Sequence, residues 1–216
     1  MRLAALGLML VLVPANAETA AQRLTGTIES YAAPVLTVKT AKGSVAITLP
    51  ADARIVANEK APFAAIKPGD FIASTATARQ DGRLVAKEVR IFPPALRGLG
   101  EGQYPHDSAS LTNAVVSSVV AVPKAKGGVL KLSFHGSTPG PNGMCSGHAP
   151  ASGQGPCTGD AEIVVTAKTS VTAWLLGDPT WLQIGKAVSL FAVADGGGKL
   201  SSPGVLVEHN GVKPLP

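Results

Sequence analysis

The chain has 216 residues and a formal net charge of +5, with 15% charged and 4% aromatic residues. Its Lys and Arg residues are spread along the chain without clusters and without interleaved aromatic side chains, which argues against a nucleic-acid-binding surface. The length is sufficient for two small domains, and we expect no nucleic-acid partner.

Residues 1–17 have the layout of a secretory signal. Arg2 precedes an apolar run, and a small-residue sequence follows that ends at Ala17. The apolar run is too short to span a bilayer well, so a cleaved signal is expected, with an uncleaved anchor as the alternative. We therefore predict cleavage after Ala17, a periplasmic location and no stable membrane insertion after cleavage.

Residues 18–93 are predicted to form a first small barrel. Alternating apolar and polar residues with many β-branched side chains favour short strands near 24–30, 35–40, 44–49, 54–58, 70–78 and 83–91. Glycines in TAKGSV and RQDGRL mark hairpin turns, and KAPFAAIKPGD is expected to hold one short helical turn. Six short strands in this length suit a closed or partly open barrel, which removes sheet edges.

Residues 94–109 are predicted to be a Gly/Pro-rich linker. It carries four polar candidates, Arg97, Glu101, His106 and Asp107. One interpretation is a binding corner between two barrels, with His106 and Asp107 as ligand or proton groups. The alternative is an ordered linker in which Arg97 and Glu101 pair with each other or with a barrel.

Residues 110–212 are predicted to form a second barrel, followed by a short tail over 213–216. Two stretches of the chain match at an offset of 116 without a gap: 44–57 with 160–173, and 67–91 with 183–207. Upstream, LTGTIES at Leu24 aligns with LTNAVVS at Leu111 at a smaller offset, because the second copy carries an insertion. A repeat of this length indicates a duplicated domain, since solenoid units are shorter.

The insertion, residues 135–159, contains both cysteines of the chain, Cys145 and Cys157. Cysteines in an exported chain meet an oxidising compartment, which predicts a disulfide between them. Chain entropy gives such a short loop a stabilisation of about 3 kcal/mol. We expect this benefit to be local, because the segment is rich in Gly and Pro and has no apparent core.

The alternative for the same residues is a zinc or copper site. Its ligands would be drawn from His106, His135, Cys145, His148 and Cys157. The spacing contains no C-x-x-C pair, and metal binding needs thiolates, which an oxidising compartment disfavours. We therefore expect no cofactor.

Trp174 and Trp181 flank the sequence LLGDPT in the second copy. They are candidates for a stacking platform on a barrel face, with packing at a barrel end as the alternative. No G-x-S-x-G sequence or paired-carboxylate constellation is present, so we expect no enzymatic activity.

The motifs GTIES, VLTVKT, KGSVAITL, IKPGDFIA and DGRLVAKEVRI together resemble a bacterial family of secreted or periplasmic proteins with a domain of unknown function. The resemblance implies an all-β fold of two tandem small OB-like barrels and a periplasmic setting, without an established activity. The second copy departs from the pattern at Gly185-Lys186, where the first copy has Gly69-Asp70.

The sequence thus predicts an exported, non-catalytic binding or envelope-assembly protein of two OB-like barrels. Its partner is expected to be an envelope protein or a small ligand, bound between the barrels or at the inserted loop. The alternative function is periplasmic metal handling through His and Cys side chains.

Overall fold

The structure is a computed structural model that describes residues 21–106, 108–122, 126–150 and 155–214. Within these ranges the chain forms sixteen β-strands and four short 3-10 helices and no α-helix, which confirms the all-β prediction. None of the described helices has the length and apolar character needed to cross a membrane. The predicted signal peptide, residues 1–17, lies outside the described residues.

The first half of the chain contains all six strands expected for the first copy. Its elements are β1 (Gln22–Ala32), β2 (Val35–Thr40), β3 (Gly43–Thr48), β4 (Arg54–Lys60), η1 (Phe63–Ala65), β5 (Phe71–Ala78), β6 (Leu84–Ile91), η2 (Pro94–Leu96) and β7 (Gly102–His106). The 3-10 helix η1 is the short helical turn expected in KAPFAAIKPGD.

The second half of the chain contains the remaining elements. They are β8 (Ala109–Ala121), β9 (Gly128–Gly136), β10 (Thr138–Pro139), η3 (Pro141–Gly143), β11 (Cys145–His148), β12 (Cys157–Val165), β13 (Ser170–Gly177), η4 (Pro179–Trp181), β14 (Ala187–Ala194), β15 (Leu200–Ser201) and β16 (Gly204–Val207). The repeat therefore extends to structure: β8, β9, β12 and β13 correspond to β1–β4, and β14–β16 correspond to β5 and β6.

Five strands close into a barrel around one core. β5 pairs with β6 and β8, β9 pairs with β8 and β12, and β12 returns to β6. Apolar side chains alternate along these strands because successive residues point to opposite faces. The inward ones form a buried cluster that includes Ile72, Val89, Val116, Leu130, Leu132, Phe134 and Ile163. We call this barrel ring B.

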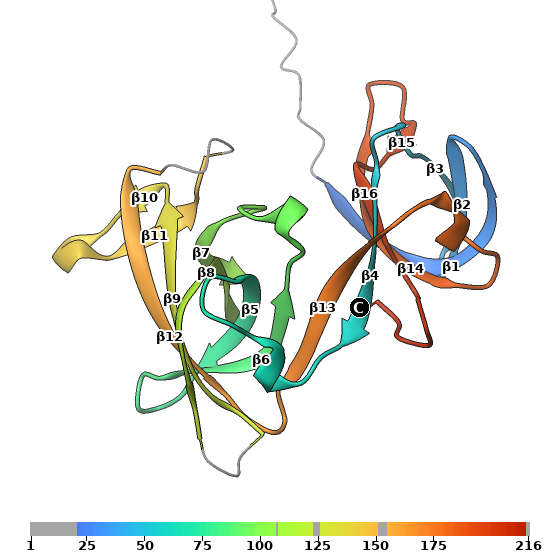
Figure 1. Cartoon of the computed structure of the whole chain (residues 1–216). Helices are drawn as coiled ribbons and strands as arrows, with labels where there is room; N and C mark the ends of the chain where they lie inside the picture. Colours follow the sequence, from blue (N-terminus) through green and yellow to red (C-terminus); the bar gives the residue numbers. More distant parts are fainter. Residues whose placement is uncertain (1–20, 107, 123–125, 151–154, 215–216) are drawn as a thin grey trace, which may run out of the picture.

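A second ring of strand pairings joins both ends of the chain. β1 pairs with β2 and β14, β3 pairs with β2 and β15, and β15 pairs with β14. Its core includes Ile28, Leu36, Val38, Ile47, Val188 and Leu190. We call this ring A, and Figure 1 shows its blue N-terminal and red C-terminal strands in one lobe.

The predicted boundaries at 18–93 and 110–212 separate the two sequence copies and not the two rings. Ring A takes β1–β3 from the first copy and β14 and β15 from the second. Ring B takes β8, β9 and β12 from the second copy and β5 and β6 from the first. The two copies have therefore exchanged their last strands within one chain.

The two copies pair with each other through β4 and β13, which lie side by side between the two lobes (Figure 1). They pair antiparallel, with Asn58 opposite Trp174. These two residues occupy equivalent positions of the repeat, at the offset of 116, so a pseudo-twofold axis passes between them. The outer edges obey the same symmetry, because β4 pairs with β16 as β13 pairs with β6, in both cases parallel.

The structure corrects the upstream alignment of the copies by one residue. β1 has a bulge between Ile28 and Ser30, and β8 has one between Val116 and Ser118. These bulges are equivalent only if Ile28 corresponds to Val116, whereas aligning Leu24 with Leu111 would pair Ile28 with Val115. Ile28 and Val116 are both buried, and a slip of one residue would turn every side chain to the opposite face.

Candidate functional site

The predicted disulfide between Cys145 and Cys157 is confirmed, with an S–S distance of 2.04 Å. The prediction of a purely local staple without a core is wrong, because Cys145 is 7% exposed and belongs to the buried cluster of ring B. The insertion also contains strand structure. β11 pairs with β7, and β10 pairs with β11, so the disulfide ties this small extension to the barrel wall.

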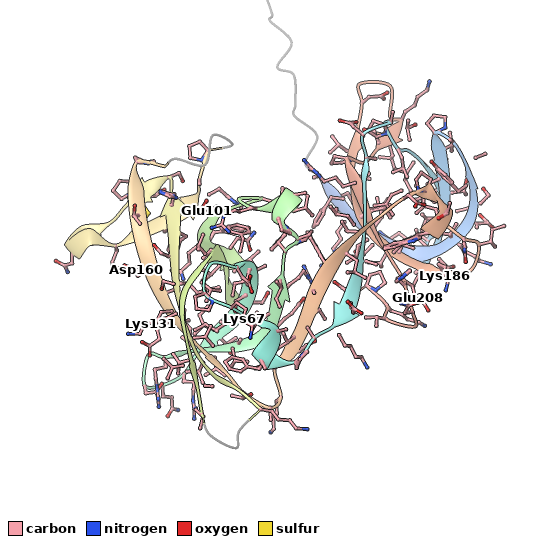
Figure 2. The ribbon with its side chains drawn as sticks, in the orientation of Figure 1. Lys67, Glu101, Lys131, Asp160, Lys186 and Glu208 are labelled. Carbon is pink, nitrogen blue, oxygen red and sulfur yellow. A yellow bond between two sulfur atoms is a disulfide. The ribbon has the colours of Figure 1, made fainter. Side chains whose placement is uncertain are left out.

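Glu101 connects the linker to the insertion. Its side chain is buried, and Oε1 lies 2.9 Å from both the backbone nitrogen and Nδ1 of His135. Because a carboxylate only accepts, the ring contact is a hydrogen bond when Nδ1 carries the proton. Figure 2 labels Glu101 in the lobe of ring B. Of the alternatives for Glu101, the structure supports pairing with a barrel.

The surroundings of Glu101 are ordered by further contacts. The backbone oxygen of Glu101 accepts from the nitrogen of Ala149 at 2.7 Å, and Asn113 Nδ2 donates to the oxygen of Leu99 at 3.1 Å. The rings of Tyr104 and His148 lie against each other, with centroids 3.6 Å apart. Burial raises the pKa of Tyr104 above its ordinary value, because the phenolate would lose solvation.

Among the other linker candidates, Arg97 has a described side chain and makes a separate contact. Arg97 donates from Nη1 to the backbone oxygen of Gly69 at 2.7 Å, so it also contacts a barrel. The backbone of His106 pairs with Ala109 at the end of β7. Asp107 lies outside the described residues. Of the predicted binding corner, the described side chains of Arg97 and Glu101 therefore lie on different contacts of the barrel.

Four candidate ligands of the alternative metal site, His135, Cys145, His148 and Cys157, make other contacts in the structure. Both sulfur atoms are in the disulfide, so neither is a thiolate in this structure. His135 binds Glu101, and His148 stacks on Tyr104. In the described part of the chain, no group of three or more His, Cys, Asp or Glu side chains converges in a way that could hold a metal ion.

The two tryptophans occupy different environments. Trp181 stacks on His209 with centroids 4.0 Å apart and packs against the core of ring A. Trp174 contacts Phe92 edge-on, with centroids 4.7 Å apart, between the rings. They therefore do not form one stacking platform, but Trp174 lies in the wall of a cavity.

This cavity lies between ring A and ring B and has a volume of about 380 Å³. Its wall is formed by residues of β1, β4, β6, β13, β14 and β16 and of the linker, including Leu96, Leu99, Trp174, Phe191 and Leu206. Such a volume lies in the usual range for small-molecule sites. Because the copies exchange strands, strands of the first copy and strands of the second copy both contribute to this wall.

Three arginines line the cavity, namely Arg23, Arg54 and Arg90. Arg90 forms an ion pair with Glu88, and its guanidinium lies 5.0 Å from the ring centroid of Trp174. Burial lowers the pKa of Arg90, and the neighbouring Glu88 opposes this effect. Arg23 donates from Nε to Ser189 Oγ at 3.3 Å, and its guanidinium lies 5.8 Å from the ring centroid of Phe191.

Sequence reasoning missed these arginines because they come from three separate strands. The comparison of the two copies contains one signal that could have identified two of these arginines. The positions equivalent to Arg54 and Arg90 in the second copy are Ser170 and Leu206, at the offset of 116. The fold therefore does not require an arginine at either position.

Comparisons of the chain with protein-family models, with curated proteins and with solved structures found no significant match.

Proposed function

We propose that this protein is an exported, non-catalytic binding protein that holds a small ligand in the cavity between its two rings. The observation that carries the proposal is the cavity of about 380 Å³, with aromatic and aliphatic walls and a few charged groups. Binding sites for small molecules have this character: they are concave, mostly apolar and marked by a small number of polar groups.

Each ring is further inferred to be an OB-like barrel. In support, both rings contain five strands in the same order, β1-β2-β3-β15-β14 in ring A and β8-β9-β12-β6-β5 in ring B. The OB fold is a five-stranded barrel that binds ligands on one face. The resemblance to a secreted tandem-barrel family points the same way. The disulfide and the signal-like N-terminus favour a periplasmic setting, since disulfides persist in oxidising compartments.

The chemistry of the wall supports binding over turnover. Among the described residues that line the cavity there is no Asp, Glu, His or Cys side chain. These side chains supply most general bases and nucleophiles of enzymes. The guanidinium groups of the wall are hydrogen-bond donors and have no acceptor atom.

The test is calorimetric titration of the mature protein with two fluorescent naphthylamines, anionic 8-anilino-1-naphthalenesulfonate and neutral N-phenyl-1-naphthylamine. Leu99 lines the cavity and is 38% exposed, so Leu99→Trp narrows the site without a core substitution. We expect this variant to weaken binding about tenfold, by loss of about 1.4 kcal/mol.

The matched control is Leu176→Trp, because Leu176 is 46% exposed and does not line the cavity. The control should bind like the unmodified protein. If Leu99→Trp binds both probes as tightly as the control does, the cavity is not the binding site and the proposed function is wrong.

A further inference from the structure

We infer that the ligand of this cavity is an organic anion, in which a carboxylate, sulfonate or phosphate group is joined to an apolar or aromatic body. The inference rests on the proposed function and adds the chemical class of the ligand. Its basis is the arrangement of charge and apolar surface in the wall.

The charge of the wall is of one sign. Arg23, Arg54 and Arg90 line the cavity, and no carboxylate among the described residues does so. Glu88 partly offsets Arg90 from the side. For Arg54, no ion pair with another described residue is formed. Guanidinium groups form strong, frequently bidentate hydrogen bonds with carboxylate and phosphate oxygens, which selects an anion.

The wall also contains hydrogen-bond donors without acceptors. Arg90 Nε and Trp174 Nε1 are buried and have no hydrogen-bond partner among the described residues. An unpartnered buried donor destabilises the folded protein. Both residues belong to the wall, which is therefore incompletely paired with the rest of the described protein.

The remaining wall suits the body of the ligand. Trp174, Phe191 and Leu96 present aromatic and aliphatic surface next to the arginines. The cavity of about 380 Å³ limits that body to a small ring system or a short chain. Burial of apolar area would then provide affinity, and the arginines would provide selectivity for charge.

The repeat supports a functional origin of this charge. The strand pairing at Arg54 and Arg90 is reproduced in the second copy at Ser170 and Leu206. The same backbone is therefore built without the arginines. Because the equivalent positions hold Ser170 and Leu206, ligand binding is a role that accounts for Arg54 and Arg90 at this cavity.

The experiment compares the two naphthylamine probes, which share one aromatic skeleton and differ by the sulfonate. At low salt we expect the sulfonate probe to bind at least tenfold more tightly than the neutral probe, since one charged hydrogen bond is worth about that factor. Arg54→Gln should lower the affinity for the sulfonate about tenfold and leave the affinity for the neutral probe unchanged.

The control is Arg79→Gln, which removes the same charge from an exposed hairpin turn outside the cavity. It should bind both probes like the unmodified protein. If Arg79→Gln weakens sulfonate binding as much as Arg54→Gln does, the attraction is a general effect of net charge, and the inference is overturned.

The two proposals fail in different ways. If both probes bind the unmodified protein with equal affinity and Leu99→Trp weakens the binding of both, the inference of an anionic ligand is overturned. The cavity then remains the binding site. Insensitivity of both probes to Leu99→Trp would overturn the site and the anion together.

Discussion

The carboxylate of Glu101 joins the linker to a strand edge of ring B. Its Oε1 accepts the backbone N–H of His135, a residue 34 positions away in sequence. β9 pairs with β12 at this residue, while its pairing with β8 ends at Ser133, so Glu101 satisfies a donor that the sheet leaves open. A buried glutamate here is a structural group that fixes the linker on the barrel.

Glu101→Ala should lower the free energy of unfolding by about 1–3 kcal/mol, because it leaves the partly buried N–H of His135 without this acceptor. Glu101→Gln keeps a carbonyl oxygen for this N–H and should cost about 1 kcal/mol or less. Denaturant midpoints at unchanged m-value measure both losses.

His135→Ala serves as the matched control, because it keeps the backbone N–H and removes only the ring contact. A loss in His135→Ala as large as that in Glu101→Ala would assign the stabilisation to the imidazole and contradict the backbone argument.

Tyr104 provides a prediction of pH dependence. Burial raises the pKa of Tyr104 above its ordinary value of 10.0, so the folded protein holds this proton more tightly than the unfolded chain. The resulting stability is complete below the unfolded pKa and is lost as the pH rises toward the folded pKa. The chain has 2 tyrosines, so the difference in tyrosinate absorbance between wild type and Tyr104→Phe isolates this group. Ionisation of Tyr104 at or below the ordinary value would contradict its burial.

At the scale of elements, the disulfide separates what sequence could predict from what it could not. The oxidising compartment expected for the chain and the presence of two cysteines correctly predicted the disulfide between Cys145 and Cys157. They could not predict that Cys145 packs into the core of ring B, because this contact depends on how the inserted segment lies against Gly136 of β9 and Gly159 of β12.

Replacing both cysteines by alanine should lower the free energy of unfolding by about 3 kcal/mol through loop entropy, and further through lost packing of Cys145. Hydrogen exchange should show reduced protection along β9 and β12 in ring B, while β1–β3 in ring A keep theirs. If protection falls only within residues 137–156, the disulfide is the local staple that the sequence suggested.

At the scale of the whole molecule, the exchanged strands predict how the chain behaves when it is divided. A mature chain cut at residue 107 yields one fragment with β1–β7 and another with β8–β16. Each ring then needs strands from both fragments. We expect each fragment alone to lack a cooperative monomeric transition, and an equimolar mixture to restore one as a 1:1 complex, measured by circular dichroism and light scattering.

The opposite result would contradict the strand exchange. A single fragment that is monomeric and unfolds cooperatively would show that one copy closes its own ring, with β5 and β6 in the places of β14–β16. The pairing of β4 with β13 would then be too weak to direct the exchange.

The cavity could not be predicted from sequence for a related reason. Arg23, Arg54 and Arg90 lie on three strands that ring closure and exchange bring together, and nothing in their local sequence marks them. The linker candidates Arg97, Glu101, His106 and Asp107 were chosen because they are close in sequence. The structure places Arg97 and Glu101 on different contacts of the barrel.

The sequence by itself determined the strands, their turns and the disulfide, because each depends on alternation, glycine positions or compartment chemistry within a short stretch of chain. Only the tertiary structure decided which copy completes which ring. A ring can be closed by strands of one copy or by the equivalent strands of the other copy, with nearly the same strand pairings. Local sequence patterns therefore do not discriminate between these two arrangements. The exchange additionally forms the β4–β13 ladder. It also packs Leu111, Val115, Trp174 and Leu206 of the second copy against a buried cluster of first-copy and linker residues, Val56, Phe71, Ala73, Phe92 and Leu96. These contacts exist only after both copies have folded together, which is why the sequence pattern of either copy does not contain them.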